Sequence, residues 1–231
     1  MARNPLIYAW TVIATGTAVA ASALLLWQPQ DMAAFAVCLG LAVLASTFKV
    51  KLPTTDGTIS PGFVFLLVAI GRLGWSETVA IGMTSAIVQL LWRRKTRPNG
   101  VQIAFNAATM AIAGGLAYGV AHGLAAQSAG DPMLFLAVAG VVLLVTNTLL
   151  VAAIVCLMRN VPLYTVWRLL QPRVIPYYLA GGVLAGVFSR ADLNTSAGVA
   201  VMAAVSAYLL SLWYRDMDGR TVPQAGTANP A

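Results

Sequence analysis

Long apolar blocks separated by short polar connections dominate the pattern of this chain. The blocks lie at about 6–27, 32–48, 60–74, 77–92, 101–124, 133–158, 174–189 and 196–214. A membrane-spanning helix needs about 20 mainly apolar residues, and a helix satisfies its backbone hydrogen bonds without water. The pattern predicts an all-α fold, a polytopic transmembrane helical bundle of about eight membrane segments. We expect residues 1–214 to form one transmembrane domain and residues 215–231 a disordered cytoplasmic tail.

Composition and charge support a membrane protein and predict its orientation. Apolar residues make up 59% of the 231 residues and charged residues 9%, with a mean hydropathy of +0.80, whereas soluble domains carry about 25% charged residues. With a cytoplasmic N-terminus, eight alternating spans leave only Arg72 and Arg190 among the basic residues outside. The prediction is N-in/C-in, multi-pass, in a bacterial inner membrane. The net charge of +7 then reflects this topology and the anionic bilayer, and nucleic acid is not an expected partner.

Two neighbouring blocks are too short for ordinary spans. Residues 60–74 would make a helix of about 22 Å, against a hydrocarbon core of about 30 Å, and residues 77–92 are only slightly longer. The pair forms either two short spans or a re-entrant hairpin at 60–92, which leaves six full spans. Both alternatives keep the basic cluster at 93–97 inside and bring Arg72 and Glu77 together at the tip. Since irregular backbone at membrane depth must be buried or face water, we expect this hairpin to be internal or to line a cavity.

A polar stretch, TTDGTISPGFVF at residues 54–65, leads into the first short block. Ser60 before Pro61 predicts a helix N-cap with proline at the first helical position, and Thr58 supplies another hydroxyl. One interpretation is a loop and a capped helix start. The other is that the positive end of a short helix faces a cavity and favours an anionic group.

Polar side chains inside other blocks extend this candidate site. Gln102, Asn106 and Thr109 share one helical face, and Asn147 lies deep in the sixth block. Such groups face the bundle interior, either as interhelical hydrogen bonds or as the lining of a binding cavity. The candidate ligand-binding residues are Thr58, Ser60, Gln102, Asn106, Thr109 and Asn147. The pair Tyr177–Tyr178 fits anchoring at the membrane interface better.

Residues for catalysis are missing from the pattern. The chain has one histidine, His122, near the outer end of the fifth block, and no acid lies in the middle of a confident span. Paired carboxylates, histidine clusters and Ser/His pairs are absent, so we expect no enzyme activity, no metal and no cofactor. The repeats Gly115/Gly119/Gly123 and Gly182/Gly186 predict close helix packing.

Four stretches resemble a known membrane module. They are KLPTTDGTISPGFVFLLVAI, VQLLWRRKTRPNGVQIAFNAATMAIAGGLAYGV, NTLLVAAIVCL and IPYYLAGGVLAG. Together, over roughly residues 40–190, they are similar to the N-terminal polytopic module of bacterial GGDEF/HD-GYP-type signalling proteins. Those relatives continue into a cytoplasmic catalytic domain, whereas this chain ends in a short polar tail. The resemblance therefore implies a sensory module without catalysis, and it transfers no ligand or site residue.

These observations favour a non-catalytic integral membrane sensory or binding module that signals through a separate membrane or cytoplasmic protein partner. Two alternatives remain open. One is a small-solute transporter or the substrate-binding membrane subunit of an uptake system, and the other is a structural subunit of a larger membrane complex. The sequence does not identify the small-molecule ligand.

Overall fold

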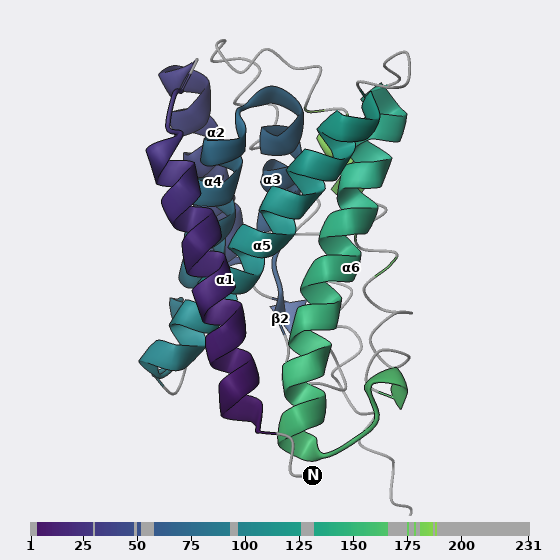
Figure 1. The fold of residues 1–231 in the computed structure, drawn as a ribbon. Coiled ribbons are helices and arrows are strands. Elements are labelled where there is room, and N and C mark those ends of the chain that lie inside the picture. Colours follow the sequence, from purple (N-terminus) through teal and green to yellow (C-terminus); the bar gives the residue numbers. More distant parts are fainter. Residues whose placement is uncertain are drawn as a thin grey trace, which may run out of the picture.

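A computed structural model describes residues 4–29, 31–48, 50–51, 58–92, 97–125, 132–165, 175, 178, 181–186 and 188. These residues form a helical bundle, as the sequence predicted (Figure 1), whereas the number of spans and the orientation stay predictions. Its helices are α1 (Pro5–Leu25), α2 (Met32–Thr47), α3 (Gly62–Arg72), α4 (Trp75–Leu91), α5 (Gly100–Ala125) and α6 (Pro132–Arg159). They match the first six apolar blocks. Residues 181–186, in the seventh block, are helical, and the predicted eighth block and tail lie outside the described residues.

Three of the helices are long and apolar enough to cross a membrane, at Pro5–Leu25, Gly100–Leu124 and Leu134–Arg159. Helices α2 and α3 are apolar but shorter. Large apolar side chains such as Leu24, Leu134 and Val141 are exposed on the outer surface of the bundle. An exposed apolar surface of this kind is typical of contact with lipid. The chain therefore has the architecture of an integral membrane protein.

Helix α3 is the central element of the bundle. All of its residues from Gly62 to Ile70 are buried, and it packs against α2, α4, α5 and α6. With 11 residues it is about 16 Å long, which is roughly half the thickness of a bilayer core. The structure thus confirms that the first short block is internal.

The turn between α3 and α4 lies beside the end of α1. The Ser76 hydroxyl, in the first turn of α4, donates a hydrogen bond to the Leu26 carbonyl at 3.3 Å. Since α1 has 21 residues and is about 31 Å long, the much shorter α3 reaches only partway back along the bundle. Its first residue therefore lies inside the protein.

A short strand pair connects α2 to α3 and departs from the all-α prediction. Strand β1 (Val50–Lys51) pairs antiparallel with β2 (Thr58–Ile59), with Val50 opposite Ile59 and Lys51 opposite Thr58. Figure 1 shows β2 among the helices, directly before α3. The segment that precedes α3 is thus partly ordered by backbone pairing.

The predicted Ser60 cap was wrong. The N-cap of α3 is Pro61, with φ −69° and ψ 2°, and the helix begins at Gly62 without a side-chain cap hydrogen bond. The turn at Pro61 lets the Val64 N–H bond the Pro61 carbonyl at 3.0 Å. Ser60 therefore precedes the cap position by one residue.

Glycine allows two helices to meet at one point. A Cβ atom at Gly16 of α1 would overlap the backbone and side chain of Ala108 in α5. In the repeat on α5, Gly115 packs against Trp75 and Val19, whereas Gly119 has nothing within 4 Å of its Cβ position. Close packing among the described residues therefore explains Gly115 but not Gly119.

We expect Gly16→Ala to lower the free energy of unfolding by about 1–3 kcal/mol, because α1 must move away from α5. The matched control is Gly119→Ala, which we expect to leave stability unchanged or raise it by up to about 1 kcal/mol through helix propensity. Thermal unfolding in nanodiscs, followed by tryptophan fluorescence, measures both. Equal effects of the two substitutions would contradict the contact.

Candidate functional site: a polar layer at the start of α3

Four helices each carry a polar residue next to the apolar core. On each helix, this polar residue lies four positions from a buried apolar residue of the core and on the same helix face. The pairs are Ala42 and Ser46 on α2, Ile81 and Ser85 on α4, Ala113 and Thr109 on α5, and Leu143 and Asn147 on α6. We call Ser46, Ser85, Thr109 and Asn147 the polar layer.

The polar layer lies at one level of the bundle. In Figure 1, α2, α4 and α6 run toward the N-terminal end and α5 runs away from it, so all four polar residues lie on the same side of the core. Leu66 of α3 packs against Gly82 of α4 and Gly114 of α5. Gly62 precedes Leu66 by one turn. Ser85 lies about one turn from Gly82, and Thr109 lies about one turn from Gly114, both toward the N-terminal end of the bundle. They therefore lie level with the start of α3.

This level is close to the middle of the bundle's long axis. Gly16 is near the midpoint of α1 and packs directly on Ala108, the residue before Thr109. With α1 about 31 Å long, Thr109 lies roughly 15 Å from either end. If the bundle spans a bilayer, the polar layer is therefore near the membrane midplane.

Three hydroxyls of the layer have no hydrogen-bond partner. Ser46, Ser85 and Thr109 are 0%, 6% and 1% exposed, and the oxygen of each side chain is buried and unpaired. A buried polar group without a partner costs about 1–3 kcal/mol. Three such groups at one level therefore call for a functional explanation.

Other helix hydroxyls in the chain satisfy themselves. Thr11, Ser22 and Thr148 each donate to the carbonyl four residues earlier, at 2.9, 2.9 and 2.6 Å. This local bond is the usual solution for serine and threonine inside a helix. The three hydroxyls of the polar layer do not make it, so they remain available to another group.

The first residue of α3 lies directly against one of these hydroxyls. The Ser46 Oγ atom occupies the space that a Cβ atom of Gly62 would need. Ser60 is also buried, at 6% exposure, and its Oγ lies 3.5 Å from the same Cβ position. The start of α3, which has no side-chain cap, thus meets two hydroxyls.

Two carbonyls at the neighbouring end of α2 have partners. The Thr47 hydroxyl donates to the Leu44 carbonyl at 2.6 Å, and the Phe48 N–H donates to the Ala45 carbonyl at 3.2 Å. At the start of α3 beside it, the cap residue makes no side-chain hydrogen bond. Donor groups of α3 and bonded acceptors of α2 therefore meet at this level.

Asn147 is held from the opposite side. A side-chain hydrogen bond joins it to Tyr178, and the Tyr178 ring lies 4.5 Å from the Phe63 ring between centroids. Gly181 packs so closely on Phe63 that a Cβ atom would overlap the ring. Tyr178 thus contacts the interior of the bundle instead of serving only as the interface anchor that the sequence favoured.

The structure separates the six residues predicted from the sequence. Ser60, Thr109 and Asn147 lie at the level of the start of α3, where Ser60 is close to Gly62. Gln102 is exposed and caps α5: its N–H donates to Asn99 Oδ1 at 2.8 Å, and the Asn99 N–H donates to Gln102 Oε1 at 3.3 Å. Asn106 donates from Nδ2 to the carbonyl of Gln102 at 2.8 Å. Thr58 contributes backbone pairing in β2, and its side chain lies outside the described residues.

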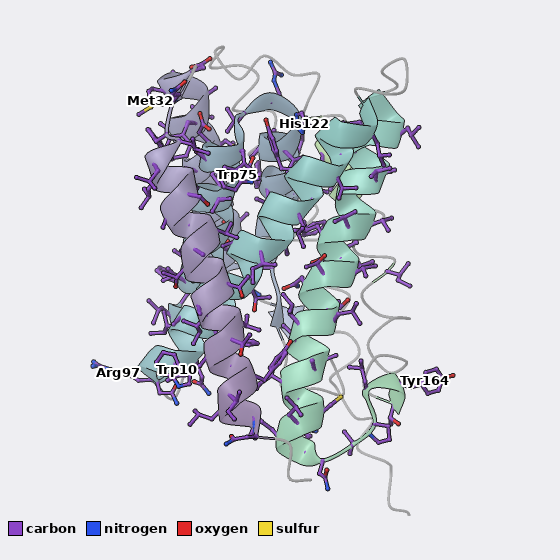
Figure 2. The ribbon with its side chains drawn as sticks, viewed as in Figure 1. Trp10, Met32, Trp75, Arg97, His122 and Tyr164 are labelled. Atoms are coloured by element: carbon purple, nitrogen blue, oxygen red, sulfur yellow. The ribbon has the colours of Figure 1, made fainter. Side chains whose placement is uncertain are left out.

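A second cluster lies at the opposite end of the bundle, where Figure 2 places His122 and Trp75. Glu77 is buried at 3% exposure and interacts electrostatically with Tyr118. The Tyr118 ring stacks on His122 with centroids 3.9 Å apart. The Glu77 carboxylate folds back over Gly74 at the start of α4, where an acidic side chain stabilises the helix N-terminus.

Among the described residues, no group of three or more His, Cys, Asp or Glu could hold a metal ion.

The chain matches no protein-family model, and no curated protein or solved structure is significantly similar to it.

We expect Thr109→Val to raise the free energy of unfolding of the ligand-free protein by about 1 kcal/mol or more, because it removes an unpaired buried hydroxyl without changing side-chain shape. The matched control is Thr148→Val, which removes the bond to the Leu144 carbonyl. We expect it to cost about 0.6 kcal/mol. Chemical or thermal unfolding of washed protein in nanodiscs measures both. Equal losses in the two variants would show that the Thr109 hydroxyl has a partner in the folded protein.

Proposed function

We propose that this chain is a non-catalytic membrane module that binds a small polar ligand in the polar layer and signals through a separate protein partner. One observation carries the proposal: the buried hydroxyls of Ser46, Ser85 and Thr109 come from three helices, lie at the level of the start of α3 and have no partners, and Ser46 contacts Gly62 directly. A ligand that supplies these hydrogen bonds removes the cost of leaving the groups unpaired. The resemblance to a bacterial signalling module supports sensing and an inner-membrane location.

Binding at this level would connect several elements. The hydroxyls belong to α2, α4 and α5, and α3 lies between these helices. A ligand shifts a conformational equilibrium only as far as it binds one state better than another. A ligand that contacts α2 and α3 together would favour the arrangement in which these two helix ends stay close. The strand pair that joins them would then carry the change to the N-terminal end.

We further propose the N-in orientation and two crossings at 60–92, one by α4 and one in which α3 covers the half of the membrane next to the turn between α3 and α4. Figure 2 shows Arg97 near the end of the bundle that holds the N-terminus, and Met32 at the other end. Basic residues accumulate on cytoplasmic sides. The hydrogen bond from Ser76 to Leu26 supports two crossings, because the turn between α3 and α4 reaches the level at which α1 ends.

A transporter is the second candidate, and one observation favours it. Transporters bind substrates near the membrane midplane at the ends of discontinuous helices, and the start of α3 has this position.

A structural role is supported by Gly119 and Gly123 on α5, which have no neighbour within 4 Å among the described residues, so that another helix has room to pack there. An adjacent gene for a kinase or cyclase would favour sensing, an adjacent ATPase pair would favour transport, and fixed stoichiometry with other subunits would favour a structural role.

The orientation predicts a labelling pattern. Gln28 and Arg97 are exposed and lie at opposite ends, while both native cysteines are buried. With N-in topology, an impermeant maleimide added to intact cells labels Gln28→Cys but labels Arg97→Cys only after permeabilisation. The reverse pattern would contradict the orientation.

The binding role predicts a retained molecule. Native mass spectrometry of the full chain, purified in nanodiscs without exchange of its membrane lipids, should show a bound small molecule that Thr109→Val and Ser85→Ala lose. The controls Thr148→Val and Ser22→Ala, whose hydroxyls bond their own helices, should retain it. An empty wild-type protein, or retention in all variants, would count against binding in the polar layer.

A further inference from the structure

We infer that the ligand presents a singly charged oxyanion, a carboxylate or a phosphodiester, to the start of α3. This inference rests on the proposed binding function and adds the chemical class of the ligand. An ionised oxyanion accepts hydrogen bonds and donates none. At this level it would meet the first N–H groups of α3, those of Gly62 and Phe63, and the unpaired hydroxyls of Ser46, Ser85 and Thr109.

The helix itself favours negative charge at this point. The N-terminus of an α-helix carries about half a positive elementary charge, and its first N–H groups point along the axis without helical partners. Anions therefore bind at helix N-termini. In α3 this end is buried, since Gly62 and Phe63 are both buried, and low polarity strengthens the attraction.

The geometry disfavours a cation. Two acceptors at the end of α2, the Leu44 and Ala45 carbonyls, are already bonded by Thr47 and Phe48. Within the part of the chain that the structure describes, the acids are Asp31 and Glu77. Asp31 is the N-cap of α2 and Glu77 lies in the first turn of α4, at the end of the bundle opposite to where α3 begins. A cation at the polar layer would therefore meet a like-signed helix terminus and no described carboxylate.

Among the described groups at this level, the positive charge is that of the α3 N-terminus, which favours a singly charged ligand. Half an elementary charge from α3, together with neutral hydroxyls, does not compensate a dianion in a medium of low polarity. A carboxylate of a small solute and the phosphodiester of an anionic lipid both carry a single charge at neutral pH. The two sources share this chemistry, and an experiment can distinguish them.

The test uses the full chain in nanodiscs of phosphatidylcholine, with the melting temperature as the readout. Sodium acetate is the free-anion probe, at the same ionic strength as sodium chloride and tetramethylammonium chloride. Replacing part of the lipid with phosphatidylglycerol supplies the anionic headgroup. We expect acetate or phosphatidylglycerol to raise the melting temperature of the wild type. A probe at ten times its Kd should raise it by about 3–6 °C.

Variants locate the effect. Ser85→Ala and Thr109→Val should lose most of the shift, whereas Ser22→Ala and Thr148→Val should keep it. The melting temperature of each variant without probe shows that it is folded, so a lost shift reports lost binding. A shift from acetate in phosphatidylcholine identifies a free solute, and a shift from phosphatidylglycerol alone identifies a lipid headgroup.

Three results would overturn the inference: a shift from tetramethylammonium instead of the anions, a shift that persists in Thr109→Val, or no shift from either anion source. The proposed function is tested separately by the retained molecule. If the protein retains a neutral or cationic molecule that Thr109→Val loses, binding in the polar layer stands and the oxyanion is excluded. If it retains nothing and no probe acts, both fail.

Discussion

Helix α3 begins inside an apolar bundle, so its first backbone N–H groups need hydrogen-bond partners from the protein, and the rest of the structure depends on this constraint. Helix α3 has about half the length of a bilayer core, and its buried start leaves N–H groups where lipid and water cannot serve them. A helix interior satisfies itself, but a helix end does not. The protein must therefore bring polar atoms to this level from the surrounding helices. Ser46 and Ser60 stand at this point, against Gly62.

Side-chain size and polarity are combined at the same place. Gly62 admits the Ser46 hydroxyl, and Gly181 admits the Phe63 ring, so the start of α3 is enclosed on two sides without larger side chains. On the other sides, each neighbouring helix changes from apolar to polar within one turn. The hydroxyls are thus held by closely packed helices, which makes their positions rigid even though they have no partners. Preorganised donors of this kind are typical of binding sites.

Sequence reasoning predicted the bundle well and the site only in part. Block length is a strong signal for helices in membranes, and the shortness of the block at 60–74 correctly placed α3 inside. The strand pair was missed because two-residue strands produce no pattern. Ser46 and Ser85 were missed for a different reason. A membrane helix is apolar on all sides, so periodicity does not show which face points inward, and one serine does not interrupt an apolar block. Gln102 shared a face with Thr109, but it lies in the first turn of α5, where side chains cap the helix.

The burial of α3 has a consequence for passage through the molecule. From Phe63 to Ile70 its side chains fill the center of the bundle with apolar volume. A hydrated solute that reached the polar layer from the side of the strand pair would meet the closely packed apolar side chains of α3 beyond it. In the described part of the bundle, α3 therefore closes the way beyond the polar layer. Movement of a solute past this level would require α3 itself to be displaced.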